Sequence, residues 1–520
     1  MVLIPRAEYE KYLAQEERIA GLEKQIETLM EAIRLSRQKQ FGSSSEKLHG
    51  DGYEQLSMLF NEAETCLPPL QTKETTTVSA HTRQKRSSRI EDILPANVPV
   101  EVVEHRMNGK NLLCPACGET MEEIGKEIRR SLVIIPAQVK IREDWYYSYA
   151  CRSCKEEAET PVVKTPKEPP VIPGSYASAE SIAHIMVQKF VMGSPLYRQE
   201  QEWNRQGVQL SRQTMSNWIL RAAEDWLKPV YDELHRQLVQ HEVLHADETT
   251  LQVLREPGKS AQSKSYMWLY RTSGDAAHPI VLYEYSATRR AANAKAFLEG
   301  FTGWLHADGY TGYHSLPQQI RVVGCWAHAR RKFDEAFKAV PKQEQATCLA
   351  LEGQRYCSAL FALEKEWAEL TAEERYKQRQ ERAKPILDAL LAWSRTKAAP
   401  PQSAFGKALH YLQEQWPWLI RYLEDGRLEI SNNRAERSIK PFVMDRKNFL
   451  FANTPGGAQG SAVIFSLIET AKENGLDPFR YLVWVMQNAP VLSTSDSGWA
   501  LKLLPRNAPA ECRTAQKADE

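Results

Sequence analysis

Two stretches of the chain, 241-HEVLHADETTLQVL-254 and 303-GWLHADGYTGY-313, share the tetrapeptide Leu-His-Ala-Asp. Both are rich in apolar, β-branched and aromatic residues, which favour β-strands. In the first stretch, the alternation of side chains along a strand places Asp247 and Glu248 on opposite faces. In the second stretch, a glycine directly after Asp308 allows the strand to end there. The two copies therefore predict two strands that carry Asp247 and Asp308.

The segments around these copies indicate how the strands are arranged. Two strand-like runs and a helical run lie between the copies, and a strand that leads into a helix comes after the second copy; these segments are 265–273, 278–287, 290–301 and 320–337. Three strands, a helix and then further strand–helix units is the order of the ribonuclease H-like fold. In that fold the first and fourth strands are neighbours. We therefore expect Asp247 and Asp308 to lie close together.

Paired carboxylates can hold the divalent cations that catalyse phosphodiester cleavage and transfer. A third carboxylate is expected from a later helix, and Glu436 lies in the segment 429-EISNNRAERSIKPFVMDRKNFLFANTPGGAQGSA-462. Cationic side chains surround it in the sequence: Arg434, Arg437, Lys440, Arg446 and Lys447. The spacing from Asn433 to Glu436 is also that of a helix capping box, so an alternative role for Glu436 is capping.

Composition sets the broad class of the protein. The chain has 520 residues, 42% hydrophobic and 26% charged, with a net charge of +1. This length predicts several domains. The first residues lack the pattern of a signal peptide, and no apolar run is long enough to span a bilayer. We expect a cytoplasmic protein, in which the 9 cysteines serve as metal ligands or buried thiols rather than as disulfides.

The N-terminal region predicts a coiled coil within residues 1–50. A helix over residues 7–38 has apolar residues every seven positions, with leucines between them: Tyr12, Ile19, Leu22, Ile26, Leu29 and Ile33. The alternative is a single amphipathic helix that packs on its own chain. Residues 51–105 predict a flexible linker, whose basic run 81-HTRQKRSSR-89 can touch phosphates or can be an ordinary solvated tether.

Residues 106–160 contain two Cys-x-x-Cys pairs, which predict a small zinc-binding module. The ligands are Cys114, Cys117, Cys151 and Cys154. Two such pairs can supply four thiolates in tetrahedral geometry, and a strand-like run between them can return the chain to the first pair. The alternatives are four unrelated cysteines or, less compatible with two pairs, a redox motif.

Residues 175–238 read as helices, and the third of them starts at 211-SRQTMSNW-218 with Ser211 as its N-cap. A turn at Gly207 before this helix is compatible with a helix-turn-helix, in which Arg212 and Asn217 would face DNA. A plain helical bundle accounts for the same pattern. Residues of about 335–425 read as a polar helical insertion, and 481–520 as a C-terminal segment.

Several of these blocks together resemble the DDE transposases of the insertion-sequence family numbered sixty-six. The resemblance covers nearly the whole chain and is carried by RQKQFGSSSEKL, CPACG with CRSC, HADETTLQV, HADGYTGY, GCWAHARRKFDEA and the block that starts at Ser431. It implies a multidomain α/β protein: coiled coil, zinc module, helical DNA-binding region and a ribonuclease H-like core over 239–480 with an all-helical insertion.

The resemblance also implies the chemistry. Asp247, Asp308 and Glu436 would be the catalytic triad that holds Mg²⁺ or Mn²⁺, and the zinc module would hold Zn²⁺. DNA would be placed by Asn432, Asn433, Arg437 and Lys440, beside Arg446 and Lys447. Cys325 and His328 match a Cys-x-x-His element whose role would be to brace the core or to bind a metal.

The implied partners are double-stranded DNA, as terminal inverted repeats and as target, a second copy of the chain through the coiled coil, and small accessory proteins of the same element. The expected location is the cytoplasm, at the nucleoid. Two alternatives stay open: a DNA-binding protein of transposon origin without catalysis, and a hydrolytic nuclease on the same fold.

Overall fold

The computed structural model describes residues 139–150 and 162–514, together with Val102 and scattered helical positions between residues 11 and 32. The chain divides into two compact units, one made of residues 1–72 and 169–512 and the other of 73–168 and 513–520. Apart from Val102, the predicted linker over 51–105 lies outside the described residues, and so do both Cys-x-x-Cys pairs. In the smaller unit, strands β1 (Ser148–Ala150) and β2 (Val162–Lys164) pair in antiparallel fashion.

The larger unit is built around a five-stranded sheet with the order β5-β4-β3-β6-β7. The strands are β3 (Val243–Gln252), β4 (Lys264–Thr272), β5 (Val281–Ser286), β6 (Gly303–His306) and β7 (Ile320–Val323). The first three pair in antiparallel fashion, and β6 and β7 run parallel to β3. The expected neighbourhood of the first and fourth strands is confirmed, since β3 lies beside β6.

The repeated tetrapeptide falls in register across these two central strands. Leu244 is opposite Leu305, and His245 is opposite His306. Because the two strands are parallel and in register, the two copies run side by side in the same direction, and Ala307 and Asp308 follow directly after the last paired residue of β6. Asp247 lies within β3, which continues, whereas Asp308 lies just beyond the end of β6.

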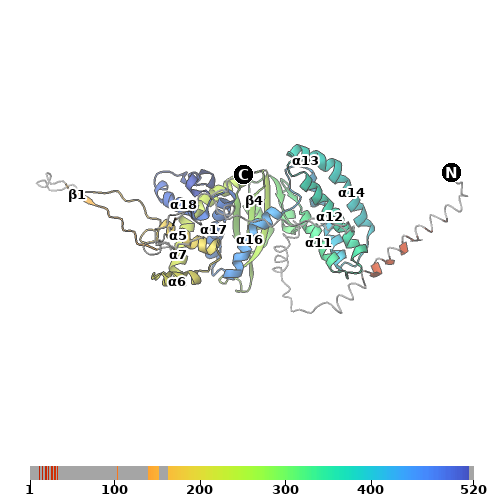
Figure 1. Ribbon diagram of the computed structural model, residues 1–520, viewed down its shortest axis with the longest axis horizontal. Helices are drawn as coiled ribbons and strands as arrows, with labels where there is room; N and C mark the ends of the chain where they lie inside the picture. Colours follow the sequence, from red (N-terminus) through yellow and green to blue (C-terminus); the bar gives the residue numbers. More distant parts are fainter. Residues whose placement is uncertain are drawn as a thin grey trace, which may run out of the picture. The chain divides into compact units, whose positions relative to one another are not determined.

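Helices before and after the sheet pack into one hydrophobic cluster with it. The earlier helices are α5 (Ala179–Phe190), α6 (Leu196–Arg205), α7 (Arg212–Ala222) and α8 (Lys228–Leu238), with a π-helical turn (Ala223–Leu227) between the last two. The later ones are α16 (Asn433–Phe449), α17 (Pro455–Glu473), α18 (Pro478–Leu492) and the short α19 (Trp499–Lys502). In Figure 1, α5, α7, α17 and α18 lie together at one side of the sheet.

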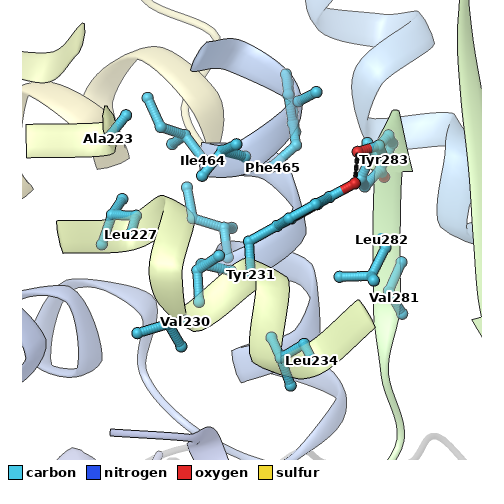
Figure 2. Packing of buried hydrophobic residues seen from close by; sticks show 14 of the residues in the cluster. Ala223, Leu227, Val230, Tyr231, Leu234, Val281, Leu282, Tyr283, Ile464 and Phe465 are labelled. Carbon is cyan, nitrogen blue, oxygen red and sulfur yellow. Dashed lines mark hydrogen bonds between the residues drawn. The ribbon is translucent and has the colours of Figure 1, made fainter. Parts of the chain in front are cut away.

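Tyr231 shows how closely α8 is joined to the sheet (Figure 2). Its ring reaches from α8 toward β5, between apolar side chains of α8, β5 and α17, and its hydroxyl donates a hydrogen bond of 3.0 Å to the Tyr283 carbonyl. The helical region 175–238 thus shares a core with the sheet. Within it, Ser211 caps α7 as predicted, because its Oγ accepts the Thr214 N–H at 3.1 Å. Gly207, with φ +82°, makes the turn between α6 and α7.

A second hydrophobic cluster is formed by helices inserted between β7 and α16. These are α11 (Trp326–Lys338), α12 (Leu349–Glu366), α13 (Ala372–Gln378), α14 (Lys384–Thr396) and α15 (Ala404–Leu419). Figure 1 shows α11 to α14 on the side of the sheet away from α5 and α18. Across the part of the chain that is described, none of the helices combines the length and the apolar character needed to cross a bilayer.

Candidate active site

Three carboxylates come together where β3, β6 and α16 meet. Asp247 is on β3, Asp308 follows β6, and Glu436 is in the first turn of α16. Burial raises the pKa of Asp247 well above its ordinary value, and the negative charges of Glu248, Asp308 and Glu436 raise it further. Burial also raises the pKa of Asp308. The structure thus gathers the three predicted carboxylates closely enough for their charges to interact.

The backbone orients both aspartates. Asp247 Oδ1 accepts the N–H of Glu248 at 2.8 Å, and Asp308 Oδ1 accepts the N–H of Tyr310 at 3.0 Å. Carboxylates held together in a buried site repel one another, and a divalent cation relieves that repulsion. Oxygen donors from carboxylates are also the ligands that Mg²⁺ and Mn²⁺ prefer. The residues present therefore fit a divalent cation with hard-ligand preference.

Glu436 does not act as a helix cap. The N-cap residue of α16 is Asn432, Asn433 is the first helical residue, and no side-chain hydrogen bond caps this helix. The capping-box alternative is therefore wrong. The carboxylate of Glu436 lies instead beside two side chains of α11: its Oε1 is 3.7 Å from His328 Nδ1, and its Oε2 is 3.7 Å from Arg331 Nη2.

Asn432 ties the start of α16 to β3. Its side-chain Oδ1 is 3.0 Å from His245 Nδ1, and its Nδ2 donates to the Ala246 carbonyl at 2.8 Å. Its backbone N–H points at the sulfur of Cys325, 3.1 Å away. Asn432 is 1% exposed, so its amide is used inside the protein. This geometry favours a bracing role for Asn432, which fixes Glu436 relative to Asp247, over the predicted contact with DNA.

The repeated histidines, each two residues before its aspartate, form a stacked pair. The rings of His245 and His306 lie 4.4 Å apart between centroids, at 11°, and both residues are fully buried. His306 Nε2 accepts the N–H of Glu429 at 3.2 Å. Burial lowers the pKa of His245 to about 3, so the ring is neutral at physiological pH. Sequence reasoning missed this pair, although the repeat itself was the signal.

Glu248 is a fourth carboxylate near the site, on the opposite face of β3. Arg289 Nε donates to its Oε1 at 2.8 Å, and the Tyr313 hydroxyl donates to its Oε2 at 2.6 Å. Burial and the charge of Asp308 raise the pKa of Glu248 to about 7, against the opposing effect of Arg289. No sequence pattern linked Arg289 or Tyr313 to Glu248, because Arg289 lies in the loop before α9 (Ala291–Phe297) and Tyr313 lies in the short helix α10 (Thr311–His314), 41 and 65 residues along the chain from Glu248.

The other predicted DNA-contacting residues differ in how they lie. Arg437 and Lys447 are exposed on α16, and Asn433 and Lys440 are half-buried there. Arg446 is used internally, since its guanidinium donates to the Thr250 hydroxyl at 2.8 Å and so ties α16 to β3. Arg212 and Asn217 are exposed on α7. Exposed cations on α16 and α7 can contact phosphates, whereas Arg446 contributes to the fold.

Comparison with known proteins identifies most segments of the chain. A family described as "Transposase IS66 family" matches residues 174–460, which is more than half of the 520 residues and contains all three carboxylates. A zinc-finger binding domain of transposase IS66 matches residues 112–155, and the IS66 C-terminal element matches 466–502. Residues 28–103 match a family described as "Transposase C of IS166 homeodomain".

Relatives from Sinorhizobium fredii align over long stretches. The uncharacterized protein y4jD is 34% identical over 396 residues, which is 74% of this chain and 75% of the relative. The uncharacterized protein y4qI is 29% identical over 518 residues, 94% of this chain and 90% of the relative. With these matches and with the carboxylate site inside the matched region, the chain belongs to the IS66 family of transposases.

Proposed function

We propose that this protein cleaves DNA at the ends of an insertion sequence and joins those ends to target DNA, with a ribonuclease H-like core as its catalytic domain. The observation that carries the proposal is the meeting of Asp247, Asp308 and Glu436 at the junction of β3, β6 and α16, where each of the other two raises the pKa of Asp247. The sheet order β5-β4-β3-β6-β7 also supports this fold.

In this proposal Asp247, Asp308 and Glu436 hold two Mg²⁺ or Mn²⁺ ions. When bound, such ions activate the attacking water or 3′ hydroxyl and stabilise the leaving oxygen. The protein supplies rigid positions for the ligands. The backbone N–H groups of Glu248 and Tyr310 hold the two aspartates, and Asn432 holds the start of α16. The 3′ hydroxyl freed at the element end would attack a phosphodiester of the target DNA and displace the 3′ oxygen of the target strand, without a covalent protein intermediate.

DNA binding is assigned to several parts of the chain. The exposed Arg437 and Lys447 on α16 suit the strand that enters the site, and Arg212 and Asn217 on α7 suit a contact farther away. Zn²⁺ bound by Cys114, Cys117, Cys151 and Cys154 would shape the module that, with α5 to α8, recognises the terminal repeats. We further propose that the protein acts in the cytoplasm, at the nucleoid.

Joining two DNA ends requires an assembly that holds both. Four residues of the predicted coiled-coil seam are exposed in the single chain: Ile19, Leu22, Ile26 and Leu29. We propose that this seam pairs two copies of the protein, because exposed apolar residues at heptad spacing are what a coiled-coil partner buries. Small accessory proteins of the same element are further proposed partners.

Strand transfer in vitro tests the function. Purified protein is incubated with labelled element-end DNA, a plasmid target and Mg²⁺, with and without extract that supplies accessory proteins. Joined product is expected from wild type and not from Asp308→Asn. The matched control is Asp388→Asn, which makes the same chemical change at an exposed position of α14. DNA that is bound but neither cut nor joined would favour a silent end-binding protein, and DNA that is cut without joining would favour a nuclease.

A further inference from the structure

A second cluster of metal-binding side chains lies next to the carboxylate site. Cys325 and His328 are at the start of α11, and Glu436 faces them from α16. One ligand atom from each residue lies within 4.8 Å of the others. This cluster differs in chemistry from the set formed with Asp247 and Asp308, because it offers sulfur and imidazole nitrogen in addition to one carboxylate.

The sulfur of Cys325 lies at the start of α11 and faces the start of α16. It accepts the backbone N–H of Asn432 at 3.1 Å. Cys325 is 1% exposed. N–H groups that point at a cysteine sulfur stabilise its thiolate, which is the form that binds metals. Burial, and after it the charge of Glu436, raise the pKa of the Cys325 thiol to about 12, so a bound cation is what would hold the sulfur as thiolate.

His328 provides an independent observation. It is 8% exposed, and neither Nδ1 nor Nε2 has a hydrogen-bond partner. Buried imidazole nitrogens nearly always have a partner, so an unpartnered pair is a sign of a missing ligand. The Nδ1 atom lies 3.7 Å from Glu436 Oε1, which is close to the separation of roughly 3.3–3.6 Å expected for two ligands of one tetrahedral zinc ion.

We propose that Cys325, His328 and Glu436 bind a borderline-soft divalent cation such as Zn²⁺, at a site distinct from the proposed Mg²⁺ site but sharing Glu436 with it. Water completes the tetrahedron, and the Cys325 thiol proton is released to solvent on binding. The ligand atoms, now within 4.8 Å, have to close by about 1 Å to reach zinc geometry.

Because both metal sites use Glu436, we expect Zn²⁺ and the catalytic Mg²⁺ to compete for it. This expectation rests on the proposed function. A carboxylate that coordinates Zn²⁺ beside His328 is drawn away from Asp247 and Asp308. Zn²⁺ would then weaken binding of the catalytic Mg²⁺, and micromolar Zn²⁺ would inhibit strand transfer in a manner that high Mg²⁺ relieves.

Metal content of the full-length protein tests the site itself. Wild type, Cys325→Ser, His328→Gln and the control Cys357→Ser are equilibrated with Zn²⁺, desalted and analysed for zinc. The control removes another fully buried thiol, in α12, that has no part in the cluster. We expect Cys325→Ser and His328→Gln to hold about one zinc per chain less than wild type and Cys357→Ser, with the zinc module contributing equally to all four.

A second spectroscopic readout and the activity assay separate the outcomes. With Co²⁺ in place of Zn²⁺, the charge-transfer absorbance from thiolate should fall in Cys325→Ser and stay in Cys357→Ser. Equal metal content in wild type and in folded His328→Gln would overturn the site, and His328→Gln carries this test if Cys325→Ser does not fold. Zinc bound at the site with no inhibition of joining would overturn the competition. Zinc bound in a protein that never joins DNA would sustain the site and reject the proposed function.

Discussion

Replacement of Asn432 by alanine separates a bracing role from a DNA-contacting one. The change removes the two side-chain hydrogen bonds to His245 and to the Ala246 carbonyl, and both of these groups are buried. The Asn432 N–H, which donates to Cys325, is retained because it belongs to the backbone. The fall in the free energy of unfolding on Asn432→Ala therefore measures the contribution of the side chain alone.

The magnitude depends on the groups that the change leaves unpaired. A buried donor or acceptor that loses its partner costs roughly 1–3 kcal/mol, and this change leaves one of each. Partial relaxation reduces the sum, so we expect the free energy of unfolding of the larger unit to fall by about 2–4 kcal/mol. The control is Asn433→Ala, which truncates the next residue, half-buried in the first helical position, and should cost less than about 1 kcal/mol.

Urea unfolding followed by tryptophan fluorescence measures the difference, with the transition midpoint compared at constant slope. Binding of element-end DNA to the same variants is measured at a temperature where all are folded. A bracing role predicts a lower midpoint for Asn432→Ala and DNA affinity within a few-fold of wild type. An unchanged midpoint with a large loss of DNA affinity would refute the reasoning and restore Asn432 as a DNA contact.

Four other substitutions test separate contacts of the structure. Asp308→Asn should raise the thermal unfolding midpoint in Mg²⁺-free buffer, because it relieves charge repulsion on Asp247. The variant should also lose the stabilisation that 10 mM Mg²⁺ gives wild type, which is roughly 1.4 kcal/mol for a dissociation constant of 1 mM. A wild-type midpoint that Mg²⁺ does not change would contradict this. Because the pKa of Glu248 is raised to about 7, folding favours its protonated form, so its contribution to stability falls as pH rises from about 4.5 to 7, and Glu248→Gln should flatten that part of a stability–pH curve. Tyr231→Phe, which removes the hydroxyl bonded to the Tyr283 carbonyl and to Glu284 at 2.9 Å, should cost about 1–2 kcal/mol in urea unfolding, and no cost would show that α8 is not held to β5 in this way. Arg379→Met should destabilise by about 3–5 kcal/mol, because Glu364 would be left without its buried partner; a double change with Glu364→Leu should recover much of that loss if the ion pair is the cause.

The sequence predicts the sheet of this protein better than it predicts the site. Strand patterns are local, so the sequence indicated the strands themselves, and their order with the intervening helix, read as that of the ribonuclease H-like fold, predicted that β3 lies beside β6. The bond from His245 to Asn432 joins residues 187 apart in the chain, and no local period encodes it. The same holds for Glu248, whose partners Arg289 and Tyr313 come from other segments.

The position of Glu436 depends on how the helical insertion begins and ends. The chain leaves the sheet at Cys325 and returns at Asn432, and hydrogen bonds join the two ends: Trp326 N–H to the Ile430 carbonyl at 3.1 Å, and Asn432 N–H to the Cys325 sulfur at 3.1 Å.

Farther out, the fully buried Arg379 donates to the carbonyls of Tyr422, Asp425 and Leu428, just before the chain returns. An insertion closed in this way can be long without displacing α16. Its two ends are already joined by hydrogen bonds, and the entropic cost of closing a loop grows only slowly with loop length. The residues that close the insertion are therefore the ones that determine where the third carboxylate lies. Cys325 and His328 are at this junction, which explains how one short motif can both brace the fold and face Glu436.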